Sequence, residues 1–156
     1  MESPKKILVQ TEGTLRQVIE NLVDAQDGLQ KIGEAARVEK VKLFLLAESL
    51  ARAEFRGELE NILHQEGVRD IHETGTPAGK FLRAWSGLKL QVGASDDSLL
   101  EIAEKEEQRA IEGYHEALSR KLPRPVEEVL AQQVQRVVAS HKFIVKARES
   151  LRQPAH

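Results

Sequence analysis

Four stretches of this 156-residue chain repeat apolar residues at intervals of three and four positions. That spacing places the apolar side chains on one face of an α-helix, where they can be buried together. The four stretches cover residues 15–36, 41–63, 100–118 and 126–151. Residues that favour helix, such as Leu, Ala, Glu, Arg and Lys, are abundant, whereas aromatic residues make up only 4%. We therefore expect an all-α protein.

Local signals mark where these helices begin and end. Thr14–Gln17 and Ser98–Glu101 have the form of capping boxes, which open helices. Gly67 suits the C-terminus of a helix, and Pro125 suits the first turn of one. They predict a loose lead-in over residues 1–13 and one domain over residues 14–152. Four helices of about 25 residues, each roughly 35–40 Å long, match in length as a four-helix bundle requires.

The connection between the second and third helices is much longer than the other two. Over residues 68–93, glycines and Pro77 interrupt the helical pattern. Thr76 and Pro77 predict the start of a short helix with Phe81 and Trp85 on its apolar side. A connection of this length can return along the bundle, so that the second and third helices run in the same direction. One such crossover, containing a short helix, is typical of a ferritin-like four-helix bundle.

Charge and composition exclude several classes of function. The 23 basic residues nearly balance the 25 acidic ones and are interspersed with them, so the chain has no basic surface for nucleic acid. There is no cysteine, hence no disulfide and no thiolate chemistry. No apolar run approaches the ~20 residues that a membrane span needs, and no signal peptide is recognisable. We expect a cytoplasmic protein that binds neither nucleic acid nor membrane.

A polar residue interrupts each of the four apolar stripes near its middle. These residues are Gln26, Glu48, Glu107 and His141. Counted from the predicted helix boundaries, each lies nine or ten residues from the same end of the bundle, which predicts that they share one layer. Three further polar residues in or beside the stripes, which we assign to the same core network, are Arg52, Glu104 and Gln133.

Two interpretations of this layer are open. Two carboxylates at one level of a core need a metal ion, an arginine or a shared proton. The first interpretation is a metal site for Fe, Mn or Zn formed by Glu48, Glu107 and His141. The second is a salt-bridged network around Arg52 with no cofactor. Ferritin-like metal centres use Glu-x-x-His pairs, but Ala51 and Val138 stand where partners of Glu48 and His141 would be, which favours the network.

Other motifs add little to these interpretations. The one Glu-x-x-His sequence, Glu112 to His115, falls on the polar side of the third helix, where a solvated pair is expected. The chain has no glycine-rich phosphate loop and no Gly-x-Ser-x-Gly sequence, so nucleotide binding and serine hydrolysis have no support.

The chain resembles a family of uncharacterised bacterial ferritin-like four-helix proteins, often described only as a domain of unknown function and sometimes linked to stress responses. The motifs that carry the resemblance are Asp24–Gly28, Arg52–Phe55, Glu58–Leu59, Trp85–Lys89, Glu104–Glu107, Tyr114–Leu118 and His141. Members tend to carry Glu-Glu where this chain has Gln26-Asp27, which argues against a metal here and leaves Asp27 as an alternative ligand if the helix is rotated. The resemblance implies a ferritin-like bundle and no established reaction.

We therefore expect a non-catalytic, stress-related or interaction protein that forms a homodimer through an exposed helix face. The alternative is a metal-binding protein or a di-iron or di-manganese oxidoreductase that uses the same layer.

Overall fold

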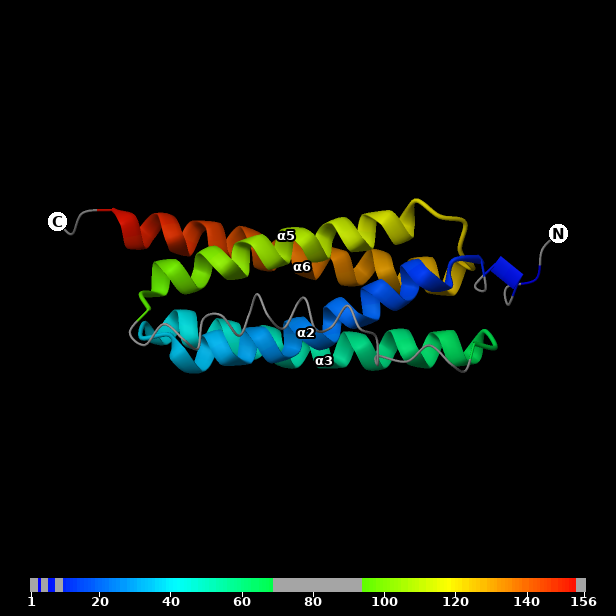
Figure 1. Ribbon diagram of the computed structural model, residues 1–156, viewed down its shortest axis with the longest axis horizontal. Helices are drawn as coiled ribbons and strands as arrows, with labels where there is room; N and C mark the ends of the chain where they lie inside the picture. The colour runs from blue at the N-terminus through cyan, green and yellow to red at the C-terminus, as the bar shows by residue number, and fades with distance from the viewer. Residues whose placement is uncertain (1–2, 4–5, 8–9, 69–93, 154–156) are drawn as a thin grey trace.

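Four long helices make up most of the described chain (Figure 1). The structure, a computed structural model, describes residues 3, 6–7, 10–68 and 94–153. The helices are α2 (Glu12–Ala35), α3 (Glu39–Gln65), α5 (Asp96–Leu118) and α6 (Arg124–Arg152). The all-α prediction is confirmed for these residues, which contain no strand. The short helix predicted within residues 76–88 lies outside them.

The four helices lie side by side as two antiparallel hairpins. In Figure 1, α2 and α6 run from right to left, whereas α3 and α5 run from left to right. Helix α2 packs against α3 and α5, and α6 packs against α5 and α3, so every pair of adjacent helices is antiparallel. Helices α3 and α5 therefore lie across the bundle from each other and run in the same direction, as the long connection between them predicts.

Both predicted capping boxes are wrong by one turn. Helix α2 begins at Glu12 after Thr11, and α5 begins at Asp96 after Ser95, whose Oγ accepts a hydrogen bond from the backbone N–H of Ser98. Each helix starts with an acidic residue in its first turn, which the positive end of the helix dipole stabilises.

The end of α3 is as predicted. Gly67 has a φ of 95° and its N–H donates to the carbonyl of His64, while the N–H of Val68 donates to Leu63. This pair of bonds is a Schellman motif, and its left-handed residue favours glycine.

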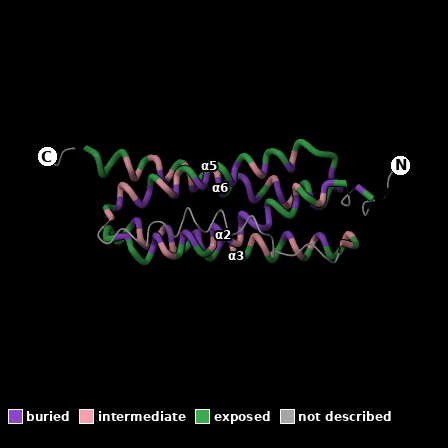
Figure 2. Tube along the Cα trace, in the orientation of Figure 1, coloured by how far each residue is buried: buried purple, intermediate pink, exposed green. Residues whose placement is uncertain are grey.

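The interior consists of two apolar clusters, and buried positions recur along all four helices (Figure 2). The larger one is built around Leu15, Leu59, Tyr114 and Leu130, and the second, nearer the other end of the bundle, around Leu29, Leu45, Leu100 and Ile144. The predicted stripe residues that are buried include Leu15, Val18, Ile19, Leu22, Leu29, Ile32, Val41, Leu45, Leu59, Leu63, Leu100, Ala103, Ile111, Tyr114, Val126, Leu130, Val134, Val137 and Ile144. Leu151 is an exception at 39% exposed.

One buried acid fixes the turn between α2 and α3 onto the start of α5. The carboxylate of Asp96 accepts hydrogen bonds from the backbone N–H groups of Arg37 and Val38, both at 2.9 Å. Two stacked rings, Phe44 of α3 and Phe143 of α6, lie 3.8 Å apart between centroids and join the hairpins near the same end. A group of buried charged residues, Glu48, Arg52 and Glu107, lies between the two apolar clusters.

Candidate functional site: a buried ionic layer

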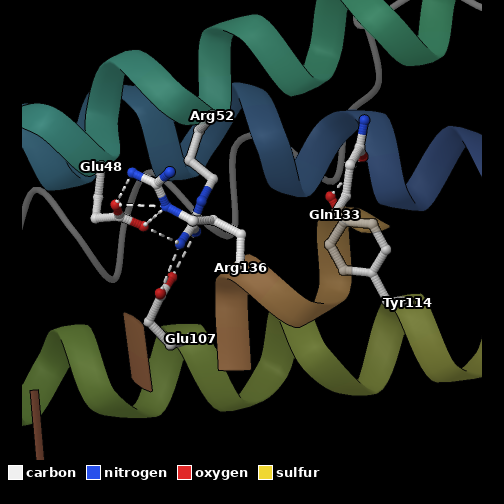
Figure 3. Close-up of polar contacts among 6 residues, drawn as sticks. All are labelled: Glu48, Arg52, Glu107, Tyr114, Gln133 and Arg136. Atoms are coloured by element: carbon white, nitrogen blue, oxygen red, sulfur yellow. Dashed lines mark hydrogen bonds and ion pairs between the residues drawn. The ribbon is translucent and has the colours of Figure 1, made fainter. Parts of the chain in front are cut away.

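The centre of the bundle contains an arginine paired with a glutamate from the opposite helix (Figure 3). Arg52 of α3 donates from Nη1 to Oε1 of Glu107 at 2.6 Å and from Nη2 to Oε2 at 2.7 Å. Arg52 is 0% exposed and Glu107 is 1% exposed. This two-bond geometry is the strongest arrangement that a guanidinium and a carboxylate form, and here water does not compete with it.

A second carboxylate in the same place is shared by two arginines. Glu48 lies one turn before Arg52 on α3, and its Oε1 is 3.4 Å from Nη2 of Arg52. Arg136 reaches in from α6 and donates to Oε2 of Glu48 from Nε at 3.0 Å and from Nη2 at 2.6 Å (Figure 3). The side chain of Arg136 is 51% exposed, whereas that of Glu48 is 3% exposed, so Arg136 connects the interior to solvent. We call Glu48, Arg52, Glu107 and Arg136 the ionic layer.

The charges of the ionic layer balance, two carboxylates against two guanidinium groups. Burial lowers the pKa of Arg52, but the adjacent Glu107 and Glu48 carboxylates outweigh that effect and raise the pKa above its usual value. The hydrogen bonds to Glu48 likewise raise the pKa of Arg136. Both arginines therefore stay charged at any pH at which the protein folds. A buried charge without a partner would cost several kcal/mol, and this pairing offsets that cost.

A neutral pair extends the polar interior one step toward the larger apolar cluster. The hydroxyl of Tyr114 donates to Oε1 of Gln133 at 2.8 Å, and Nε2 of Gln133 donates to the backbone carbonyl of Phe55 at 3.0 Å and to Glu58 at 3.3 Å. Burial raises the pKa of Tyr114, so its hydroxyl remains a donor. Gln133 thus lies beside the ionic layer, and it provides the partner that a buried tyrosine hydroxyl needs.

The donor set of the ionic layer does not fit a ferritin-like metal centre. Such a centre needs carboxylate oxygens that are free to coordinate, with a Glu-x-x-His pair from each of two helices. Here both oxygens of Glu107 accept from Arg52, and both oxygens of Glu48 accept from guanidinium groups. Within the described ranges, no three His, Cys, Asp or Glu side chains are grouped closely enough to hold a metal ion.

The structure places two predicted layer residues elsewhere. His141 is half-buried and lines a surface cavity of about 390 Å³ between α5 and α6, together with Glu104 and Arg148. Glu104 is not in the core network either, because it forms an ion pair with Arg148, whose pKa is raised by that hydrogen bond. Ser140 takes the inward position beside Val137 on α6 and is 2% exposed. The predicted convergence of His141 with Glu48 and Glu107 is therefore wrong.

Gln26 also stays outside the ionic layer. It is half-buried, and its backbone carbonyl accepts from the hydroxyl of Ser49 at 2.6 Å, while its side chain has no hydrogen bond to the residues that the structure describes. The neighbouring Asp27, the alternative ligand, is exposed. Glu112 and His115 are both exposed, as predicted for the Glu-x-x-His sequence.

Three buried acids between α2 and α5 were missed by the sequence analysis. Glu20, Asp24 and Glu106 are 2%, 1% and 4% exposed. Both carboxylate oxygens of Asp24, and one oxygen of each glutamate, have no hydrogen-bond partner in the described part of the chain. Burial, with the nearby charges of Glu20, Asp27 and Glu106, raises the pKa of Asp24 to about 7. Burial also raises the pKa of Glu20 and of Glu106.

The fold and the ionic layer define an all-α four-helix protein whose core is divided by paired charges. None of the helices in the described ranges combines the length and apolar character needed to cross a bilayer. A family model described as a domain of unknown function, DUF2383, matches residues 10–120, which include α2, α3 and α5. The chain belongs to this family. None of the curated proteins matches it.

Proposed function

We propose that this protein is a non-catalytic ferritin-like bundle in which a guanidinium group takes the place that metal ions occupy in the di-iron and di-manganese bundles. Its role is that of a stress-related or interaction protein, and the ionic layer serves the fold. The bidentate pair between Arg52 and Glu107, at 2.6 and 2.7 Å in a fully buried position, carries the proposal.

The helix directions support the ferritin-like assignment. Two antiparallel hairpins joined so that α3 and α5 run in the same direction are the arrangement that one long crossover produces. In the metal-binding bundles, glutamates from facing helices meet at mid-height. Glu48 and Glu107 come from the corresponding facing helices here, but Arg52 lies between them.

Charge accounts for why an arginine suits this position. Two glutamates brought together in a core repel each other unless a cation lies between them. A divalent ion and a pair of guanidinium groups carry the same total charge of +2, so Arg52 and Arg136 neutralise Glu48 and Glu107 as one divalent ion would. A guanidinium satisfies the carboxylate lone pairs through hydrogen bonds but provides no open coordination position and no redox chemistry. The layer therefore supports structure rather than a reaction.

Metal content tests the proposal directly. Protein purified without chelator is analysed for Fe, Mn and Zn, and its thermal unfolding is measured with and without each ion. We expect less than stoichiometric metal and no shift in melting temperature. Stoichiometric metal that is lost in both Glu48→Gln and Glu107→Gln would overturn the proposal and establish the metal-binding alternative.

A second experiment separates a structural role of the layer from a chemical one. The double variant Arg52→Met/Glu107→Leu replaces the bidentate pair with apolar side chains of similar size. In a strain that lacks the gene and is sensitive to stress, we expect this variant, if it folds, to restore the stress tolerance of the wild-type strain. Failure of the folded double variant, alongside restoration by the wild-type protein, would contradict a purely structural role.

A further inference from the structure

The outer side of α3 carries apolar residues where a solvated helix normally carries charged ones. Leu43 is 58% exposed and Leu50 is 68% exposed, the two largest exposures among the large apolar side chains described. The residues that continue this surface, which we call the α3 outer stripe, are Leu43, Ala47, Leu50, Ala53 and Gly57. Single exposed leucines are ordinary, but leucines repeated at a seven-residue spacing form the seam of a helix pair.

The α3 outer stripe is symmetric about Leu50. Leu43 lies seven residues before it and Gly57 lies seven residues after it. A Cβ atom added at Gly57 would meet nothing within 4 Å, so the helix surface there is open enough to receive a side chain. If two copies of α3 pair antiparallel across a two-fold axis at Leu50, Leu43 of each copy lies over Gly57 of the other. The leucine of each copy then packs where the glycine of the other copy leaves space, and the two-fold axis repeats this contact, as an isologous interface requires.

The charges beside the stripe favour the same pairing. Lys40 in the first turn of α3 and Glu58 in its second half are both exposed. Lys42 and Glu60 already have partners in their own chain, because Lys42 donates to the backbone carbonyls of Gly33 and Glu34, and Glu60 pairs with Arg56. In the antiparallel register centred on Leu50, Lys40 of one copy lies on the same flank of the pair as Glu58 of the other, because each residue turns the helix by about 100°. A parallel pairing would bring lysine toward lysine and glutamate toward glutamate. Antiparallel helices also align their dipoles favourably. The sign pattern therefore selects the antiparallel arrangement.

We propose that the α3 outer stripe binds a second copy of this chain, as an antiparallel α3–α3 pair with its two-fold axis at Leu50. The proposal specifies the register: residue numbers that face each other across the pair sum to about 100. It rests on the outer surface of α3, and it holds whether or not the ionic layer has the structural role proposed above.

Cysteine cross-linking tests the register, because the natural chain has no cysteine to interfere. Leu50→Cys is expected to be joined to its own copy by a short bis-maleimide, since packed helix axes lie about 8–10 Å apart. Leu43→Cys alone is expected not to be joined, because the two copies of residue 43 lie roughly 21 Å apart along the helices at 1.5 Å per residue. A mixture of Leu43→Cys and Gly57→Cys is expected to form the heterodimeric product. Equal cross-linking of Leu50→Cys and Leu43→Cys would overturn this register.

Self-association tests the surface itself. Wild-type protein is followed by light scattering across a concentration series beside Leu50→Lys, which places two like charges together at the proposed axis. We expect a dimer for the wild-type protein and roughly hundredfold weaker association for the variant, because a central contact is lost from both copies. Leu151→Lys is the matched control, since Leu151 is also exposed but lies on α6, and it should remain dimeric.

Circular dichroism distinguishes loss of pairing from loss of folding. Leu50 is mostly exposed, so the monomeric variant should keep the helical signal of the wild-type protein. A wild-type protein that stays monomeric throughout the series, or a dimer that Leu50→Lys does not weaken, would refute the proposal.

Discussion

Replacing Arg52 by methionine removes the cation at the centre of the ionic layer and leaves a buried carboxylate behind. Methionine is close to arginine in length and has no charge, so the substitution adds little empty volume. Glu107 then loses both of its hydrogen-bond donors, while Glu48 keeps those from Arg136. The variant therefore isolates the consequence of leaving one carboxylate, 1% exposed, without a partner.

The size of the effect follows from the burial of the pair. Opposite charges about 4 Å apart attract by about 4 kcal/mol at an effective dielectric constant of about 20, and by about 1 kcal/mol in water. Breaking a buried pair on one side costs about 3–5 kcal/mol because the remaining charge stays desolvated. We expect Arg52→Met to lower the free energy of unfolding by that amount. This would be a large part of the 5–15 kcal/mol that stabilises a typical domain.

Urea unfolding followed by circular dichroism measures this free energy through the midpoint and slope of the transition. Arg120→Met is the matched control, because Arg120 lies 2.6 Å from Glu116, the same distance as in the buried pair, but both side chains are more than half exposed. We expect the control to change stability by less than about 1 kcal/mol. The comparison keeps the substitution and the shortest N–O distance constant, whereas the control pair is exposed and has one hydrogen bond in place of two.

A double-mutant cycle identifies the carboxylate as the source of the loss. Adding Glu107→Leu to Arg52→Met removes the orphaned charge, and we expect most of the stability to return, since replacing both members of a buried pair by apolar residues is often close to neutral. The reasoning is refuted if Arg52→Met is as mild as the Arg120 control. It is also refuted if the double variant is no more stable than Arg52→Met.

Three further predictions concern other buried polar groups. The pKa of Asp24 is raised from 3.8 to about 7, so the stability it contributes is complete below about pH 4 and is lost as pH rises to about 7. Asp24→Asn should therefore be more stable than wild type at pH 8, by up to about 4 kcal/mol, with the difference fading toward pH 4, and Glu34→Gln, at an exposed position of the same helix, is the control substitution. Tyr114→Phe removes the donor to Gln133 and should cost about 1 kcal/mol in urea unfolding, and a gain in stability would contradict the hydrogen bond. Asp96→Ala removes the acceptor for two backbone N–H groups of the α2–α3 turn and should lower stability by about 1–3 kcal/mol with faster hydrogen exchange there, whereas unchanged exchange would argue against this contact.

The helical phase of the apolar stripes was sufficient to predict the bundle and the centre of the ionic layer. Glu48, Arg52 and Glu107 each replace an apolar residue in a stripe, and a helix in this environment can only direct such a residue inward. The two capping boxes failed because a serine or threonine three residues before an acidic or amide side chain is a weak local signal. Thr11 and Ser95, one turn earlier, also stand before acidic residues and are the N-cap positions that the structure uses. Ser95 caps α5 through its side chain, whereas the hydroxyl of Thr11 donates to the carbonyl of Ile7.

Two errors at the site have a common physical origin. A helix in a four-helix bundle packs against two neighbours, so its buried arc is wider than one stripe. Asp24 lies outside the stripe that faces the centre of the core but within the contact between α2 and α5, and it is 1% exposed. His141, one residue beyond Ser140, lies at the edge of the α6 stripe and turns to the surface cavity. A rotation of one residue, 100° around a helix, decides between these outcomes.

Arg136 could not be found from phase, because its side chain begins on the exposed side of α6 and reaches inward only through its length. Its contribution nevertheless determines the charge balance of the layer. Glu48, Arg52 and Glu107 lie within residues 10–120, the part of the chain that matches the family model, and together they carry a net charge of −1. Arg136 lies beyond that part and brings the sum to zero. Packing of α6 buries Glu48 and at the same time brings the arginine that neutralises it, so the layer does not carry the cost of a buried net charge. The pairing of Glu48 with Arg136 thus joins the last helix to the other hairpin by charge as well as by apolar contact.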